Sequence, residues 1–179
     1  EEKLPADHRV VLTPDQCKWV INNTELEVFV RSSNVRCFSD DQYQELGVPV
    51  VEDLSDCDIL LGVKEVPVDS LIANKTYFYF SHTIKGQSYN MSLLQRMLDL
   101  DIKMIDYEVL KDEEGRRLIG FGYYAGLIGA YNAFITYGMK SKRYSIKAAN
   151  QCNNEDEMFR ELDKIDLTNE RILVTGNGK

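Results

Sequence analysis

The chain has 179 residues, 44% of them hydrophobic, which is enough for one well-packed core or for one domain and part of a second. Its 21 Lys and Arg residues against 29 Asp and Glu residues give a formal net charge of −8. This balance argues against a nucleic-acid partner, because such a partner needs a concentrated basic face. No stretch approaches the run of about 20 apolar residues that crosses a bilayer, and no apolar signal core is present, so we expect a cytoplasmic protein with no membrane segment.

The first expected helix carries three signals of a helix start. Thr13 is a suitable N-cap, Pro14 stands at the first helical position, and Asp15 lies in the first turn. We expect this helix to run to about Asn22. Beyond it, short apolar runs and helical patterns alternate along the chain.

This alternation predicts an α/β fold. Extended segments are expected at residues 27–31, 48–53, 58–63, 76–80 and 103–107. Further helices are expected at residues 40–46, 89–100, 123–134 and 155–164. The apolar runs at 58–63 and 76–80 are of the kind that is buried on two faces, so we predict a Rossmann-like or flavodoxin-like parallel sheet with helices on both faces.

Two of the expected helices carry packing patterns. The helix over 89–100 has one apolar stripe, made by Met91, Leu94, Met97 and Leu98. The helix over 123–134 is rich in glycine and alanine, which would allow close approach to the sheet.

The four cysteines predict no special chemistry. They lie far apart, with no C-x-x-C pair and no histidine beside them: Cys17, Cys37, Cys57 and Cys152. This spacing favours free, reduced thiols in the core and predicts neither a catalytic thiol nor a metal site.

The end of the sequence, ILVTGNGK, reads as a buried strand followed by two glycines at the spacing of a phosphate-binding turn. We therefore divide the chain into three parts. Residues 1–139 are expected to form the N-terminal catalytic (substrate) domain, and 140–170 a connector with a helix. Residues 171–179 are expected to form the first strand and glycine turn of a nucleotide-binding domain that this chain does not complete.

Cationic side chains follow two of the expected strands, where ligands collect in open α/β sheets. Lys64 directly follows one apolar strand, and His82 and Lys85 follow the next. Arg117 lies before the glycine-rich helix. Taken alone, each also fits a solvated or structural role. Together with Arg9 they would form a cationic cleft in an acidic chain, which suits a substrate with carboxylates, because guanidinium groups bind carboxylates through paired hydrogen bonds.

Several blocks of the sequence resemble the superfamily of alanine dehydrogenase and saccharopine dehydrogenase. In order, they are HRVVLTP, ILLGVKEVP, YFYFSHTIKGQSYNM, IDYEVLKDEEGRRLIGFGYYAG and VTGNGK. The resemblance spans nearly the whole chain. The blocks around SHTIK and GRR look more like the lysine-forming saccharopine dehydrogenases and lysine–ketoglutarate reductases than like alanine dehydrogenase.

The resemblance implies an N-terminal catalytic domain of an NAD(P)-dependent oxidoreductase that interconverts saccharopine with lysine and 2-oxoglutarate. Lys64 and His82 match its acid/base pair. One would exchange the proton on the amine nitrogen, and the other would assist loss and addition of water at the imine carbon. The implied substrate-binding residues are Arg9, Lys85, Glu108, Arg117 and Phe121. Among them, Glu108 would tune the neighbouring arginine.

The same resemblance implies a cofactor, NAD or NADP. Gly176 and Gly178 match the start of the glycine turn, and the helix that receives the pyrophosphate would lie outside this chain. We therefore expect the 179-residue chain alone to be inactive. Its expected partners are an amino acid or 2-oxo acid substrate and the remainder of its own polypeptide, and a homo-oligomer is compatible with the sequence.

Two other functions stay open at this point. One is an alanine-dehydrogenase-like enzyme that acts on a small 2-oxo acid with ammonia, for which a single arginine and lysine would suffice. The other is a non-catalytic α/β module that binds an amino acid or a partner. Such a module would have no need of His82 and Lys64 facing one another.

Overall fold

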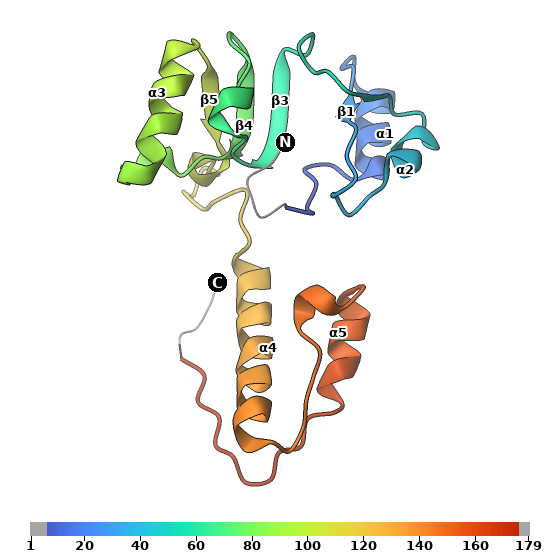
Figure 1. Ribbon diagram of the computed structural model, residues 1–179, viewed down its shortest axis with the longest axis vertical. Helices are drawn as coiled ribbons and strands as arrows, with labels where there is room; N and C mark the ends of the chain where they lie inside the picture. Colours follow the sequence, from blue (N-terminus) through green and yellow to red (C-terminus); the bar gives the residue numbers. More distant parts are fainter. Residues whose placement is uncertain (1–6, 176–179) are drawn as a thin grey trace. The chain divides into compact units, whose positions relative to one another are not determined.

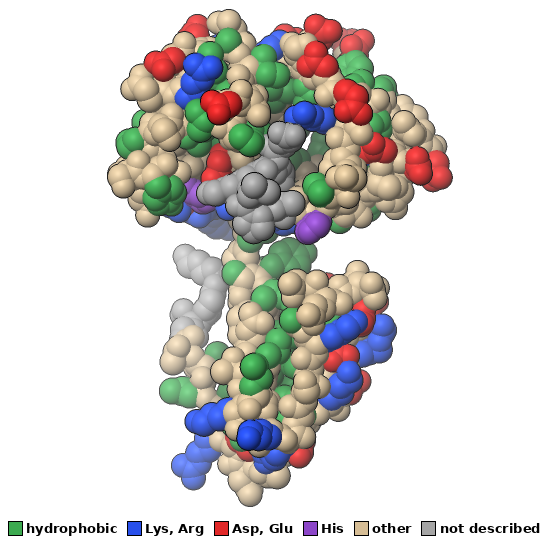
Figure 2. Space-filling model, viewed as in Figure 1, with side chains coloured by type: hydrophobic (Ala, Val, Ile, Leu, Met, Phe, Trp, Pro, Cys, Tyr) green, Lys and Arg blue, Asp and Glu red, His purple; other side chains and the backbone are tan. Residues whose placement is uncertain are grey.

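The computed structural model describes residues 7–175, which divide into two compact units, 7–120 and 121–175 (Figure 1). The division at Gly120 comes earlier than the predicted domain boundary at residue 139, which stays a prediction. Both units carry acidic and basic side chains on the face seen in Figure 2. Over the described residues, no helix is both long and apolar enough to cross a membrane.

The first unit has the predicted α/β fold. Its strands are β1 (Val30–Arg31), β2 (Val50–Val51), β3 (Ile59–Lys64), β4 (Thr76–Phe80) and β5 (Lys103–Asp106). Its α-helices are α1 (Pro14–Asn23), α2 (Asp40–Gln44) and α3 (Met91–Asp99). Short 3₁₀ turns lie at Val68–Ser70, Thr83–Lys85, Ser88–Asn90 and Tyr107–Val109.

All strand pairs of this unit are parallel, but they form two sheets, β1-β2 and β3-β4-β5, where the sequence predicts one. The first sheet is short. Only two residue pairs of the segments 27–31 and 48–53 are in register, Val30 with Val50 and Arg31 with Val51. Among the described residues, neither β1 nor β2 pairs with a strand of the second sheet.

The start of α1 is confirmed. The Thr13 hydroxyl accepts a hydrogen bond from the Gln16 backbone N–H at 3.3 Å, and the Gln16 side chain accepts one from the Thr13 N–H at 2.9 Å, which makes a capping box. On its inner face, Cys17 packs with Tyr43 of α2 and with Val48 in a small core beside β1 and β2.

Strand β4 is buried on both faces, as predicted. On one face, Tyr77 and Tyr79 pack against Leu93 and Met97 of α3, which runs along the sheet (Figure 1). On the other, the rings of Phe78 and Phe80 lie 6.3 and 5.3 Å from that of Tyr107. Successive side chains of β4 therefore pack on opposite faces of the sheet.

For this sheet and its covering helix, one packing prediction is wrong and another is only partly right. Among the described residues, β3 is the edge strand of its sheet. Its Ile59 and Leu61 are about half exposed, so β3 is buried on one face only. In α3, the buried row is Leu93 and Met97, whereas Leu98 is 67% exposed and Leu94 only half-buried. Residues four apart share a row and adjacent residues differ by about 100°, so two neighbouring apolar rows compete for the sheet.

The second unit contains α4 (Gly122–Ser141), a 3₁₀ turn at Ala149–Gln151 and α5 (Glu155–Leu162). Its core is formed by Tyr131, Ile146 and Met158, so the predicted connector is packed rather than loose. Residues 121–175 contain no strand, and the small residues of α4 therefore meet no sheet in their own unit. One of them, Gly138, instead allows Tyr144 to lie against the helix.

Two further expectations concern the end of the chain and the thiols. Residues 171–175 form no strand, although the sequence predicts one from Ile172, because a strand needs a partner and the described part of this unit is helical. Gly176 and Gly178 lie outside the described residues.

The cysteines are free, but of the four only Cys17 is buried and Cys37 is exposed, so the prediction of core cysteines is only partly right.

Candidate active site

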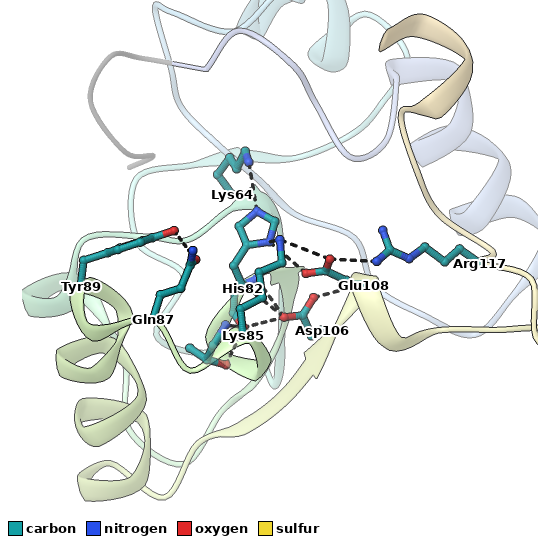
Figure 3. A network of polar contacts seen from close by, with 10 residues as sticks. Lys64, His82, Lys85, Gln87, Tyr89, Asp106, Glu108 and Arg117 are labelled. Atoms are coloured by element: carbon teal, nitrogen blue, oxygen red, sulfur yellow. Dashed lines mark hydrogen bonds and ion pairs between the residues drawn. The ribbon is translucent and has the colours of Figure 1, made fainter. Parts of the chain in front are cut away.

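Polar side chains meet at one edge of the three-stranded sheet (Figure 3). Lys64 is the last residue of β3, His82 follows β4, and Asp106 ends β5 with Glu108 two residues later. Because the three strands are parallel, their carboxyl ends meet at the same edge. The sequence interpretation placed Lys64 and His82 at strand ends, and the structure brings these two side chains together.

Lys64, His82 and Glu108 form a line of contacts. Lys64 Nζ lies 3.5 Å from His82 Nε2, and His82 Nδ1 lies 3.0 Å from Glu108 Oε2. A carboxylate only accepts hydrogen bonds, so we assign the imidazole proton to Nδ1, which donates it to Glu108. The lone pair of Nε2 then faces the Lys64 amine. This arrangement suits transfer of a proton between Lys64, His82 and a bound molecule.

Glu108 is buried, and it also binds two flanking cations. Its Oε1 accepts a hydrogen bond from Arg117 Nη2 at 2.9 Å and lies 3.3 Å from Lys85 Nζ. The hydrogen bond from His82, followed by those from Lys85 and Arg117, outweighs the opposing effect of desolvation and lowers the pKa of Glu108 to about 2. Glu108 is therefore ionised throughout the neutral range and keeps three nitrogen-bearing side chains together.

Lys85 Nζ lies 3.1 Å from His82 Nδ1 as well. With the proton on Nδ1, both atoms are donors, so this is a contact and not a hydrogen bond. The acceptor for Lys85 is Glu108. Lys85 and Arg117 are 43% and 55% exposed, and Arg117 has further N–H groups with which to bind a carboxylate from solution.

The backbone of His82 is in an unusual conformation. Its φ of 57° and ψ of 8° place it in the left-handed region, where a non-glycine residue costs about 1–3 kcal/mol and persists only if its surroundings hold it. Three donors from Ser81 and His82 bond to the Asp106 carboxylate, and the ring of Phe80 stacks on that of His82 at 6.2 Å. Strained backbone of this kind is concentrated at functional sites.

Arg9 lies in the N-terminal segment of the first unit, where it pairs with Asp7. It donates a hydrogen bond from Nε to Asp7 Oδ1 at 2.8 Å, and the two side chains form an ion pair. The pKa of Asp7 is lowered mainly by the hydrogen bond from Arg9, and also by the charge of Lys64, so this segment is within electrostatic range of the site. Phe121 precedes α4 in the second unit, and its predicted role stays a prediction.

Among the predicted site residues of the first unit, hydrogen bonds and ion pairs join Lys64, His82, Lys85, Glu108 and Arg117. Sequence reasoning missed Ser81, Asp106 and Asp7. An acidic residue near the end of a predicted strand, as Asp106 is in the segment 103–107, is a signal that could have found one of them. Across the described part of the chain, no cluster of three or more His, Cys, Asp or Glu side chains is arranged to hold a metal ion.

Comparison with known proteins places this chain in a family. Residues 1–128 match the family described as alanine dehydrogenase/PNT, N-terminal domain. The chain belongs to this family. Its α/β fold resembles that of an L-alanine dehydrogenase structure with a TM-score of 0.65, over 81% of this chain and 42% of that one, at 16% sequence identity.

Two curated relatives are closer in sequence. The mitochondrial alpha-aminoadipic semialdehyde synthase of Rattus norvegicus is 40% identical over 133 residues, which are 74% of this chain and 14% of that protein. The NAD(+)-dependent, L-lysine-forming saccharopine dehydrogenase of Emericella nidulans is 36% identical over 135 residues, or 72% of this chain and 36% of that protein. The chain thus spans well under half the length of either relative.

Proposed function

We propose that this chain is the substrate-binding catalytic domain of an NAD(P)-dependent oxidoreductase that interconverts saccharopine with lysine and 2-oxoglutarate. The observation that carries the proposal is the line from Lys64 through His82 to the buried Glu108, at the carboxyl edge of a parallel sheet. The names of the two sequence relatives support the substrate, since one is a lysine-forming saccharopine dehydrogenase.

The proposed reaction makes or breaks a carbon–nitrogen bond, and it needs protons at two places. The lysine amine must lose a proton as it attacks the carbonyl carbon, and the departing oxygen must gain protons to leave as water. His82 Nε2 and Lys64 Nζ, 3.5 Å apart, are placed to exchange these protons. Glu108 would stabilise the imidazolium whenever His82 carries both protons, because Nδ1–H already donates to it.

The substrate carboxylates would bind to the flanking cations. Arg117 and Lys85 are partly exposed and each binds Glu108, and the segment of Arg9 is within electrostatic range of Lys64. Hydride transfer would be the chemistry of the nicotinamide cofactor. Gly176 and Gly178, the predicted cofactor residues, lie outside the described residues, so the described part of this chain accounts for substrate binding and proton transfer only.

The decisive experiment is substrate profiling of the full-length protein that contains this chain. With NADH or NADPH, we expect turnover with 2-oxoglutarate and lysine together, and little with either alone. A preference for pyruvate and ammonia would contradict the proposal and favour an alanine-dehydrogenase-like activity. Tight binding of lysine without any turnover would favour a non-catalytic amino-acid-binding module. The 179-residue chain alone is expected to show no turnover.

A further inference from the structure

The Asp106 carboxylate is buried, and it accepts hydrogen bonds from two neighbouring loops. Its Oδ2 accepts from the Ser81 hydroxyl at 2.6 Å and from the backbone N–H groups of Ser81 and His82, both at 3.2 Å. Its Oδ1 accepts from the Glu108 backbone N–H at 2.8 Å. One side chain therefore holds the backbone of both His82 and Glu108.

This connection matters because the sheet itself does not reach these residues. The last residue pair in register between β4 and β5 is Tyr79 with Asp106. His82 and Glu108 both lie beyond this pair, yet their side chains must stay within hydrogen-bond distance. Beyond the last ladder pair, the Asp106 carboxylate connects the segment that follows β4 with the segment that follows β5 (Figure 3).

The same carboxylate also stabilises the left-handed backbone of His82. The N–H groups of two consecutive residues, Ser81 and His82, point at one oxygen, which fixes the direction of the chain at φ 57°. The Ser81 hydroxyl adds a contact with the Thr83 hydroxyl at 2.8 Å on the far side of His82. The turn is thus held on both sides of the histidine.

We propose that Asp106 is a positioning residue of the site. By holding the backbone of His82 and Glu108 at once, it keeps His82 in the tautomer with the proton on Nδ1, so that Nε2 faces Lys64. The proposal extends the function proposed above, because Asp106 would act on the reaction only through His82. Its effect on the tautomer, however, is a property of the folded protein without substrate.

The tautomer is measured by NMR on protein labelled with ¹⁵N in histidine, at a pH where the imidazole is neutral. In the wild type, we expect the His82 signals of a single form, with a protonated Nδ1 and an unprotonated Nε2. Asp106→Asn keeps the size of the side chain but replaces one acceptor oxygen by an NH₂ donor. In this variant we expect a mixture of both tautomers at His82. The His82 signals are assigned by their loss in His82→Gln, and those of His8, in the N-terminal segment, are the internal control.

A second variant covers the case in which Asp106→Asn does not fold. Ser81→Ala removes the 2.6 Å bond to Asp106 and leaves both backbone donors in place, so we expect the same change at His82 to a smaller extent. Where Asp106→Asn folds, an unchanged Nδ1–H tautomer overturns the proposal. Where it does not fold, an unchanged tautomer in Ser81→Ala overturns it.

Kinetics of the full-length protein separate this proposal from the proposed function. If both hold, Asp106→Asn lowers kcat by about 100-fold, as expected for a misplaced catalytic group, and leaves KM nearly unchanged because Asp106 contacts none of the carboxylate-binding cations. If the wild type has no turnover with lysine and 2-oxoglutarate, the proposed function fails, while the tautomer measurement still decides the role of Asp106. A rise in KM with an unchanged kcat in Asp106→Asn would contradict the proposed positioning role of Asp106.

Discussion

The pKa of a glutamate is lowered to about 2 at Glu108 in the first unit and at Glu157 and Glu170 in the second. Glu108 and Glu170 have different neighbours. Glu108 in the first unit owes its low pKa chiefly to the hydrogen bond from His82, and Glu170 in the second chiefly to the one from the Tyr137 hydroxyl. Glu170 also forms an ion pair with Arg143. The partners of Glu170 do not exchange protons near neutral pH, whereas those of Glu108 include a histidine that faces a lysine.

The comparison shows that a perturbed carboxylate pKa does not by itself mark a reactive site. Glu170 bonds to Arg143 and Tyr137, which are 27 and 33 residues away in sequence. These bonds hold the segment after α5 against the end of α4. Glu108 joins side chains at the carboxyl edge of a sheet, beside a strained backbone. What distinguishes the two is whether the neighbours are able to take and return a proton.

The largest expected effect comes from removing either residue of the proposed acid/base pair. In the full-length protein, His82→Ala and Lys64→Ala should each lower kcat by about 10²–10⁴-fold, the usual contribution of a positioned acid or base. Neither should change the midpoint of thermal unfolding by as much as a core substitution does. Lys18→Ala, an exposed lysine of α1, is the matched control and should keep full activity. Equal losses of stability and activity would favour structural roles for His82 and Lys64.

The next effect concerns packing in the second unit. At Gly138, an added Cβ would lie 2.8 Å from both the ring and the backbone oxygen of Tyr144, so Gly138→Ala should destabilise this unit by about 1–3 kcal/mol. At Gly129 in the same helix, an added Cβ would meet nothing within 4 Å, and Gly129→Ala should stabilise α4 by up to about 1 kcal/mol. Urea denaturation followed by circular dichroism measures both. Equal effects of the two substitutions would show that the close approach of Tyr144 is not needed.

A smaller pair of effects tests the comparison of the two glutamates directly. Glu108→Gln keeps the shape of the side chain but removes the charge that balances Lys85 and Arg117 and stabilises the imidazolium. We expect kcat/KM to fall by roughly tenfold or more, since one pKa unit at an acid/base group corresponds to a factor of ten. Glu170→Gln should leave kcat/KM of the folded protein unchanged and lower the unfolding midpoint instead. A kinetic effect of the same size from both variants would remove the distinction between the units.

The sequence predicts much of this site because the order and direction of the strands place its residues. The apolar run at 76–80 forms β4 with those bounds, and parallel strands necessarily bring Lys64 and His82 to one edge. The capping signals at Thr13 likewise depend only on local chemistry. What could not be predicted depends on choices between near-equal alternatives. Leu93 and Leu94 lie in adjacent apolar rows of α3, and only the packed sheet decides between them.

The left-handed conformation of His82 belongs to the same class of features. No local signal marks it, because glycine is the residue that normally adopts this conformation, and it is stabilised by Asp106, 24 residues further along the chain. The role of Asp106 therefore follows only from the folded structure. The same holds for the low pKa of Glu108, which requires His82 and Lys85 from one segment and Arg117 from another.

The smallest expected effect is on the pH dependence of stability, and it concerns one glutamate in each unit. The folded-state pKa of Glu108, about 2, lies below its ordinary value of 4.5, so its contribution to stability is complete above pH 4.5 and is lost as the pH falls towards 2. Glu170 behaves in the same way. Glu108→Gln and Glu170→Gln should each flatten the fall in the free energy of unfolding over this range, measured by urea denaturation at successive pH values. If Glu108→Gln leaves the slope unchanged, its carboxylate is not held by His82, Lys85 and Arg117 in solution, and the proton path from Lys64 through His82 loses its support.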